Sequence, residues 1–167
     1  MSGAQYEREL KHILEGDKGV IEKYIKGNGL KGKNSDAMLY LVRYPFFVIR
    51  SAGSKSLDLL AVRGGLVLPI EIKSSSSETI NFTDSNGRNQ KQYALLVKAV
   101  RKSNLMLFYA VRLKNSGGEP WRIFSAYGMK GWAWVPHVSE TKNGNILLKW
   151  GVGLALSQFL RRVNRVD

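Results

Sequence analysis

Two acidic residues flank a predicted β-hairpin turn at positions where they would face one another. Gly64–Gly65 is a dipeptide favoured in two-residue hairpin turns. If these glycines form the turn, Arg63 faces Leu66. Continuing along the ladder, Asp58 faces Glu71 in a non-hydrogen-bonded pair, which is the closer kind. Unless a bulge shifts the register, their Cβ atoms lie ~4.5–5.5 Å apart on one face of the sheet.

Such a pair of carboxylates is suited to metal-assisted hydrolysis of a phosphodiester. Two like charges directly opposite in a strand pair are destabilising, so a cation should offset them. Lys73, which projects from the same face two residues beyond Glu71, is one candidate. A divalent cation is the other, and ligands that are all oxygen suit Mg²⁺, with Mn²⁺ as a substitute. A bound metal can polarise a phosphoryl group and lower the pKa of a water, which Lys73 would orient.

The alternative is a solvated cluster of charges on an exposed face of the sheet. The two acids, however, interrupt the apolar strand sequences LDLLAV and PIEIK. Charged residues are seldom placed inside apolar strands without a partner, so the pattern favours a built site.

These residues resemble a known nuclease motif. Asp58, followed after twelve residues by Glu71-Ile72-Lys73, resembles the PD-(D/E)xK motif, although the proline before the aspartate is missing. Two further stretches are more specific: GAQYEREL at residues 3–10 and VIRSAGSKSLD at residues 48–58 closely resemble the archaeal-type Holliday junction resolvases. The resemblance implies a single α/β domain of the restriction-endonuclease-like fold, with a mixed central β-sheet flanked by helices.

The resemblance also implies roles for particular side chains. A helical glutamate of the first stretch, Glu7, would complete a metal site with Asp58 and Glu71, and Lys73 would assist catalysis. The same motifs imply residues that contact DNA and a further polar residue of the active site. DNA phosphates would be contacted by Arg8, Arg50, Ser51, Ser54 and Lys55, and Gln92 would occupy a polar position of the active site.

The implied function is a metal-dependent endonuclease that resolves four-way DNA junctions by paired symmetric cuts, acting as a homodimer with Mg²⁺. Two alternatives stay open. One is another PD-(D/E)xK endonuclease, of the restriction or repair type, that cuts ordinary duplex. The other is a DNA-binding module without catalysis, although acids facing a phosphate would give a pure binder no advantage.

The charge of the chain agrees with a nucleic-acid partner. The 167 residues include 26 Lys and Arg against 13 Asp and Glu, which gives a net charge of +13. A field of this sign attracts polyanions, although solubility alone is the alternative explanation. The segment between Asp84 and Glu119 has no acid and seven basic residues.

Other classes are excluded by composition. The chain has no cysteine, so disulfide frameworks and zinc–thiolate sites are excluded. No apolar run approaches the ~20 residues that span a bilayer, and no membrane partner is expected. The first residues lack a secretory signal, so we expect a cytoplasmic protein, associated with the nucleoid or acting for a virus in its host.

Hydrophobic periodicity predicts the elements that would position these residues. The chain contains four amphipathic stretches, five strand-like stretches and three polar stretches. Helices are predicted at residues 4–15, 20–25, 89–102 and 152–163; strands at 46–50, 57–62, 66–73, 105–111 and 121–127; loops at 26–36, 51–56 and 74–86, the last of them mobile.

Two regions have no counterpart in the resemblance: an insertion at residues 15–45 and an extension at residues 128–167. Within the insertion, GNGLKGKN nearly matches a phosphate-binding loop but lacks the final Ser or Thr, so no nucleotide cofactor is expected. For the homodimer, we expect an apolar contact formed by residues 105–111 and 121–124 with Leu156, Phe159 and Leu160. The alternative is that these residues complete the core of the monomer.

Overall fold

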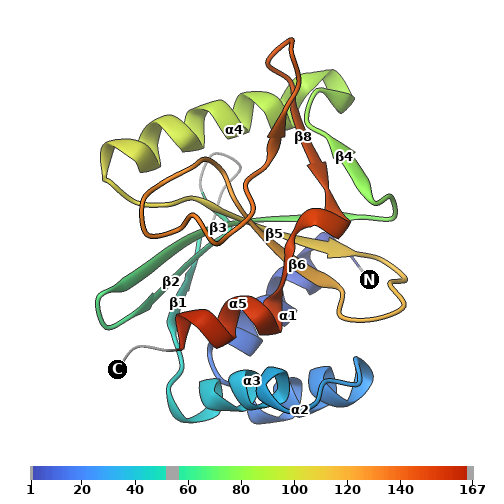
Figure 1. Cartoon of the computed structure of the whole chain (residues 1–167), viewed down its shortest axis with the longest axis vertical. Coiled ribbons are helices and arrows are strands. Elements are labelled where there is room, and N and C mark those ends of the chain that lie inside the picture. Colours follow the sequence, from blue (N-terminus) through green and yellow to red (C-terminus); the bar gives the residue numbers. More distant parts are fainter. Residues whose placement is uncertain (1, 52–56, 165–167) are drawn as a thin grey trace.

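The computed structural model describes residues 2–51 and 57–164 (Figure 1). Ser54 and Lys55 therefore lie outside the described residues. The helices are α1 (Gly3–Leu14), α2 (Lys18–Gly27), α3 (Lys33–Arg43), α4 (Asp84–Lys102) and α5 (Leu156–Val163), with a short 3-10 turn at Trp150–Val152. The strands are β1 (Phe47–Arg50), β2 (Leu59–Arg63), β3 (Leu66–Ser75), β4 (Thr79–Asn81), β5 (Phe108–Leu113), β6 (Trp121–Ser125), β7 (Ser139–Glu140), β8 (Ile146–Lys149) and β9 (Leu154–Ala155).

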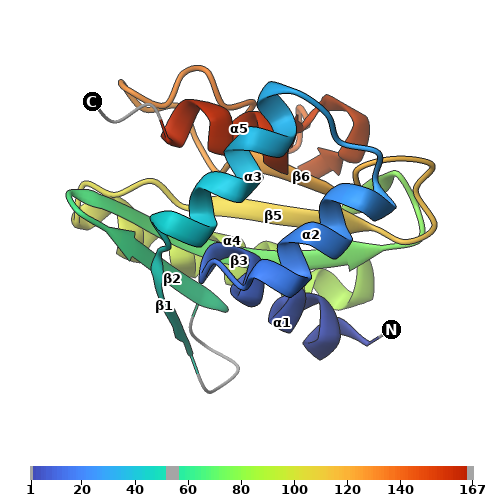
Figure 2. The same cartoon turned by 90° about the horizontal axis from the view of Figure 1, so that it is seen from below.

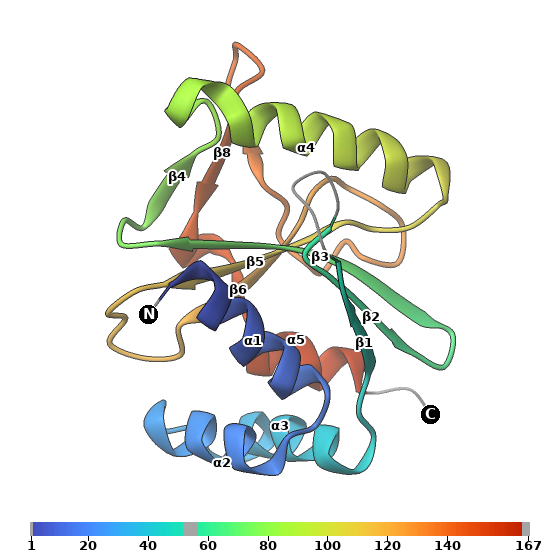
Figure 3. The same ribbon diagram turned by 180° about the vertical axis from the view of Figure 1, so that it is seen from behind.

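A six-stranded mixed sheet forms the centre of the molecule, in the order β1-β2-β3-β5-β6-β9. Only β3 and β5 pair in parallel; the other neighbours are antiparallel. Helix α4 and the small β4-β8-β7 sheet lie on one face, while α1 and α5 lie on the other, with α2 and α3 beneath them (Figures 1 and 3). The prediction of a mixed α/β fold with a central sheet flanked by helices is confirmed.

The register predicted for the β2–β3 hairpin, which turns at Gly64–Gly65, is confirmed. Strand β2 pairs with β3 from Arg63↔Leu66 to Leu59↔Ile70, with no bulge between them. Leu68 and Ile70 face the apolar layer formed with α1 and α5. Because side chains alternate along a strand, Glu71 projects from the opposite face, which α4 covers.

The predicted dimer contact is wrong, because its residues complete the core of the monomer. Strand β5 lies between β3 and β6, and residues Phe108 to Val111 are at most 1% exposed. Phe124 of β6 is equally buried, and α5 packs against the sheet through Leu156, Phe159 and Leu160. An apolar run covered on both faces is typical of a central strand, so these buried residues offer no surface to a second chain.

Two predicted loops are shorter than expected. Residues 26–36 contain only a brief connection, because α2 extends to Gly27 and α3 begins at Lys33 after Gly32, whose φ of +56° suits glycine. Residues 74–86 contain the end of β3, the strand β4 and the start of α4. Distant partners cause this difference: Ser75 pairs with Leu113 on β5, and β4 pairs with β8.

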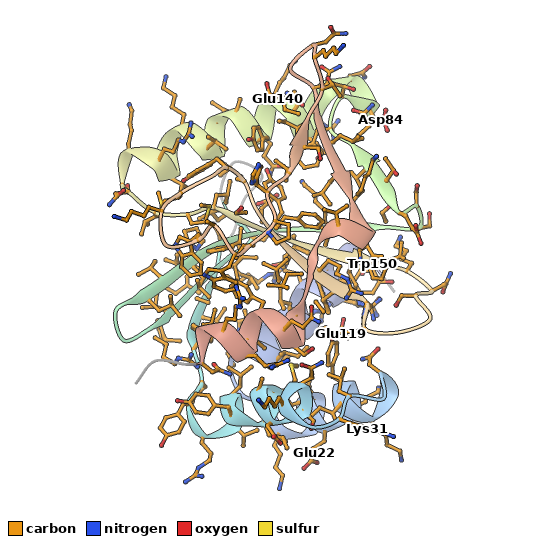
Figure 4. All side chains as sticks on the ribbon, in the orientation of Figure 1. Glu22, Lys31, Asp84, Glu119, Glu140 and Trp150 are labelled. Carbon is orange, nitrogen blue, oxygen red and sulfur yellow. The ribbon has the colours of Figure 1, made fainter. Side chains whose placement is uncertain are left out.

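The N-terminal helical region is joined to the body of the domain by polar contacts. Helix α2 lies beside α1, and α3 crosses next to α5 (Figure 2). Glu119 lies between these elements (Figure 4): its carboxylate accepts hydrogen bonds from the Tyr24 hydroxyl on α2 and from the backbone and hydroxyl of Ser157 on α5. No helix of the described ranges is long and apolar enough to span a bilayer.

Candidate active site

The carboxylates of Asp58 and Glu71 occupy the end of the β2–β3 hairpin beneath α4. Glu71 is 2% exposed, and its Oε1 accepts a hydrogen bond from Gln92 Nε2 at 2.8 Å. Asp58 lies one residue before β2, where its Oδ2 accepts from the backbone N–H of Ile72 at 2.7 Å. That bond holds the Asp58 side chain against β3 beside Glu71.

Lys73 uses all of its hydrogen-bonding capacity in this site. Its Nζ donates to Glu71 Oε1 at 3.3 Å, to Asn89 Oδ1 at 3.1 Å and to Gln92 Oε1 at 2.9 Å. An ammonium has three N–H donors, so each of them is engaged. The two amides come from the N-terminal half of α4, and the orientation of the lysine is therefore set by this helix.

Burial and mutual repulsion disfavour the charged forms of both carboxyls. Burial, followed by the charge of Asp58, raises the pKa of Glu71 to about 7, against the opposing effects of Lys73 and Gln92. The pKa of Asp58 is also raised, mainly by burial, and the charge of Glu7 contributes. Lys73 alone does not balance the two acids.

Glu7 reaches the edge of this site from α1, but it is paired with a different cation. Arg50, at the end of β1, donates its Nε to Glu7, and this contact raises the pKa of the arginine. Arg8 is exposed and donates to the carbonyl of Ala4 at 3.2 Å on its own helix. Ser51 donates its backbone N–H to the carbonyl of Asp58 at 3.2 Å.

The donor set of Asp58 and Glu71 fits a hard divalent cation. Both ligands are carboxylates, which Mg²⁺ prefers. Oε2 of Glu71 is buried and has no hydrogen-bond partner among the described residues, which is costly for a polar atom unless a further ligand occupies it. No group of three or more His, Asp or Glu residues suited to a metal ion occurs in residues 2–51 and 57–164, so Glu7 does not complete such a cluster here.

The structure thus brings together Asp58, Glu71, Lys73 and Gln92, and it places the Glu7–Arg50 pair next to them. Asn89 also belongs to this group, although the sequence alone did not predict it as a site residue. The available signal was its position three residues before Gln92, which places both amides on the same side of a helix. Arg8 contacts none of these side chains among the described residues.

Comparison with known proteins assigns the family. The model of the archaeal Holliday junction resolvase (hjc) family matches residues 28–165, which is most of the chain and includes Asp58, Glu71 and Lys73. The chain belongs to this family. The family has a Holliday junction resolvase function, so this chain is an endonuclease that acts on junction DNA.

The fold comparison agrees with this assignment. The 1.6 Å structure of Archaeoglobus fulgidus Hjc, a Holliday junction resolvase from an archaeal hyperthermophile, matches with a TM-score of 0.50 and 20% identity. The match covers 75% of this chain and 89% of that chain. At this identity the likeness concerns the fold. A search of curated protein sequences gives no match.

Proposed function

We propose that this resolvase cuts two strands of a four-way DNA junction symmetrically, as a homodimer that depends on Mg²⁺, with Mn²⁺ as a substitute. Asp58 and Glu71 would bind the cation, and Glu7 would join them after releasing Arg50. The observation that carries the proposal is Oε2 of Glu71, which is buried and unpartnered among the described residues, beside an ammonium that does not balance both acids.

When bound, Mg²⁺ would polarise the scissile phosphoryl group and lower the pKa of an attacking water. Lys73 would contact the reacting groups directly. Its contact to Glu71, at 3.3 Å, is the longest of its three hydrogen bonds. Once Glu71 binds a cation, Lys73 can exchange this contact for the reacting phosphate or the water. Asn89 and Gln92 would keep the ammonium in place while charge develops on the phosphate.

Phosphates next to the cut would be held by a basic and hydroxyl-rich group around the β1–β2 connection, with one residue of α1. Arg50 and Ser51 lie beside Asp58 through the contacts described above. Such contacts position the backbone without reading sequence, which suits a nuclease that selects a DNA shape. The proposed phosphate ligands are Arg8, Arg50, Ser51, Ser54 and Lys55.

Two copies are required because one chain offers one Asp58–Glu71–Lys73 site. A two-fold axis would present two sites to two strands of like polarity, and both cuts would fall within one binding event. We place this activity in the cytoplasm, where the DNA of the cell or of an infecting virus is accessible. The division into a nuclease body, an insertion at residues 15–45 and an extension at residues 128–167 also remains a proposal.

The test compares cleavage of four-way junction, flap and linear duplex of matched sequence, each with Mg²⁺ and with a chelator. The proposal predicts rapid paired cuts of the junction that need Mg²⁺. Equal cleavage of linear duplex would instead identify a restriction-type or repair-type nuclease. Tight binding of the junction without cleavage in any metal would identify a DNA-binding module.

A further inference from the structure

Helix α4 carries a line of basic side chains that the catalytic site does not use. Arg88, Lys91, Lys98 and Lys102 are exposed, and Leu95, in the middle of the line, is 68% exposed. Successive members are three, seven and four residues apart, so they share one side of the helix. We call these four basic residues the α4 flank. At 1.5 Å per residue it extends over about 21 Å.

The α4 flank adjoins the catalytic site and not the small sheet. Gln92, which contacts Glu71 and Lys73, lies four residues after Arg88 and three before Leu95, at the border of the flank. The other side of α4 is covered: Tyr93 and Arg101 line a 530 Å³ cavity shared with residues 126–128 and 137–140. The same helix thus carries catalytic contacts inward and a basic line outward, with α1 on the far side of the sheet (Figure 3).

The charges of the α4 flank are not neutralised by any residue that the structure describes. None of its four members forms a hydrogen bond or ion pair with residues 2–51 or 57–164. By contrast, Arg101 stacks on the ring of Tyr127 at 4.4 Å. Like charges three or four residues apart on a helix destabilise it, and the next acid after Asp84 is Glu119. An external anion of matching length would remove this repulsion.

We infer that the α4 flank binds the sugar–phosphate backbone of one duplex arm of the junction, continuing from the phosphate that is cut at Glu71 and Lys73. This inference rests on the proposed function. Duplex DNA carries one charge per ~1.7 Å of its axis, so a 21 Å segment carries about twelve phosphates, about six on each strand, and those on the near side can contact the flank. A membrane surface fits less well, because the apolar side of α4, with Leu96 and Val100, is buried in the core.

The test neutralises the two lysines farthest from the catalytic site. In Lys98→Gln/Lys102→Gln, junction affinity should fall about tenfold at moderate salt, and the slope of log affinity against log salt should decrease by about 1.8, as expected for two lost phosphate contacts. The matched control is Lys130→Gln/Lys142→Gln, which removes two exposed lysines outside the flank. The control should change affinity less than about twofold, since it removes no flank contact. Fluorescence anisotropy in a chelator measures both quantities, and circular dichroism checks that both variants are folded.

Arm length separates this inference from its alternatives. On a junction whose arms are shortened to about four base pairs, ~14 Å at 3.4 Å per pair, Lys98→Gln/Lys102→Gln should bind nearly as tightly as the control variant, because the duplex ends before it reaches Lys98 and Lys102. An unchanged salt slope in Lys98→Gln/Lys102→Gln, while the wild type cleaves junctions, would overturn the inference alone. Failure of the wild type to prefer or cut junctions would instead overturn the proposed function. A change in oligomeric state with unchanged DNA affinity would assign the flank to protein contacts and overturn the inference.

Discussion

Gln92 donates its side-chain amide to Glu71 at 2.8 Å and joins α4 to the buried carboxylate on β3. The carbonyl oxygen of the same amide accepts from Lys73 at 2.9 Å. A single side chain therefore orients both the acid and the ammonium. Asn89, one turn earlier, contacts Lys73. The two amides should thus have separable effects.

Asn89→Ala and Gln92→Ala test this separation. Asn89→Ala should slow single-turnover cleavage about tenfold and leave metal affinity unchanged, because only Lys73 loses a partner. Gln92→Ala should slow cleavage by about 10–100-fold and also change metal affinity, because Glu71 loses its hydrogen bond. Gln158→Ala, at an exposed position of α5, is the control for both. Equal effects of the two variants on metal affinity, measured by calorimetry, would contradict the assignment.

The buried carboxyl of Glu71 should make the free energy of unfolding depend on pH. Burial raises its pKa from an ordinary 4.5 to about 7. Between pH 4.5 and about pH 7, and without a bound cation, the Glu71 carboxyl is protonated in the native state but ionised in the unfolded state. The free energy of unfolding therefore falls as pH rises through this window. In Glu71→Gln this part of the decline disappears.

Urea unfolding in a chelator measures the difference. At pH 8, the free energy of unfolding of Glu71→Gln should exceed that of the wild type by about 3 kcal/mol, since the pKa rises from 4.5 to about 7 and each unit is worth ~1.4 kcal/mol. At pH 5 the two proteins should differ by about 1 kcal/mol, because the native carboxyl is still protonated while the unfolded one is already mostly ionised. A constant difference between pH 5 and pH 8 would show that Glu71 is ionised throughout.

The Glu7–Arg50 pair predicts a competition between arginine and metal. Arg50→Gln removes the cation that holds Glu7, so Mg²⁺ affinity should rise, by about threefold or more, if Glu7 is a ligand. Junction affinity should fall in the same variant, because a phosphate contact is lost. Calorimetry with Mg²⁺ measures the first effect. Unchanged metal affinity would leave Glu7 outside the metal site.

Paired cutting predicts a clear result with mixed dimers. On a supercoiled plasmid that extrudes a cruciform, the wild type should give linear product in one encounter. Heterodimers of wild type and Glu71→Gln should give nicked circles, because one of the two sites is inactive. Light scattering should show twice the chain mass at moderate salt. A monomer that still linearises the plasmid in one encounter would rule out the two-site scheme.

The sequence predicted that Asp58 and Glu71 lie together because their geometry depends on a local turn. The Gly64–Gly65 turn determines the register, and every pair from Leu59 to Arg63 follows it. The partners of Lys73 depend on tertiary packing. Residues 74–86 are polar, and nothing local indicates that β4 finds β8 and leads into α4, so Asn89 could not be assigned.

The error about the dimer contact has a similar cause. An apolar run such as residues 105–111 can be covered by the chain itself or by a second copy, and periodicity does not distinguish these cases. The parallel pairing of β5 with β3 makes it a central strand, and α5 returns to cover it. Both facts depend on contacts between residues far apart in the sequence.

We propose that Asp58 and Glu71 bind the metal that supports cleavage of the junction. The decisive experiment measures single-turnover cleavage and binding of a four-way junction by Glu71→Gln and Asp58→Asn, in Mg²⁺ and in a chelator. We expect no detectable cleavage by either variant and junction affinity within about threefold of the wild type, because affinity comes mainly from phosphate contacts. Cleavage of the junction by pure Glu71→Gln that still requires Mg²⁺ would contradict this proposal.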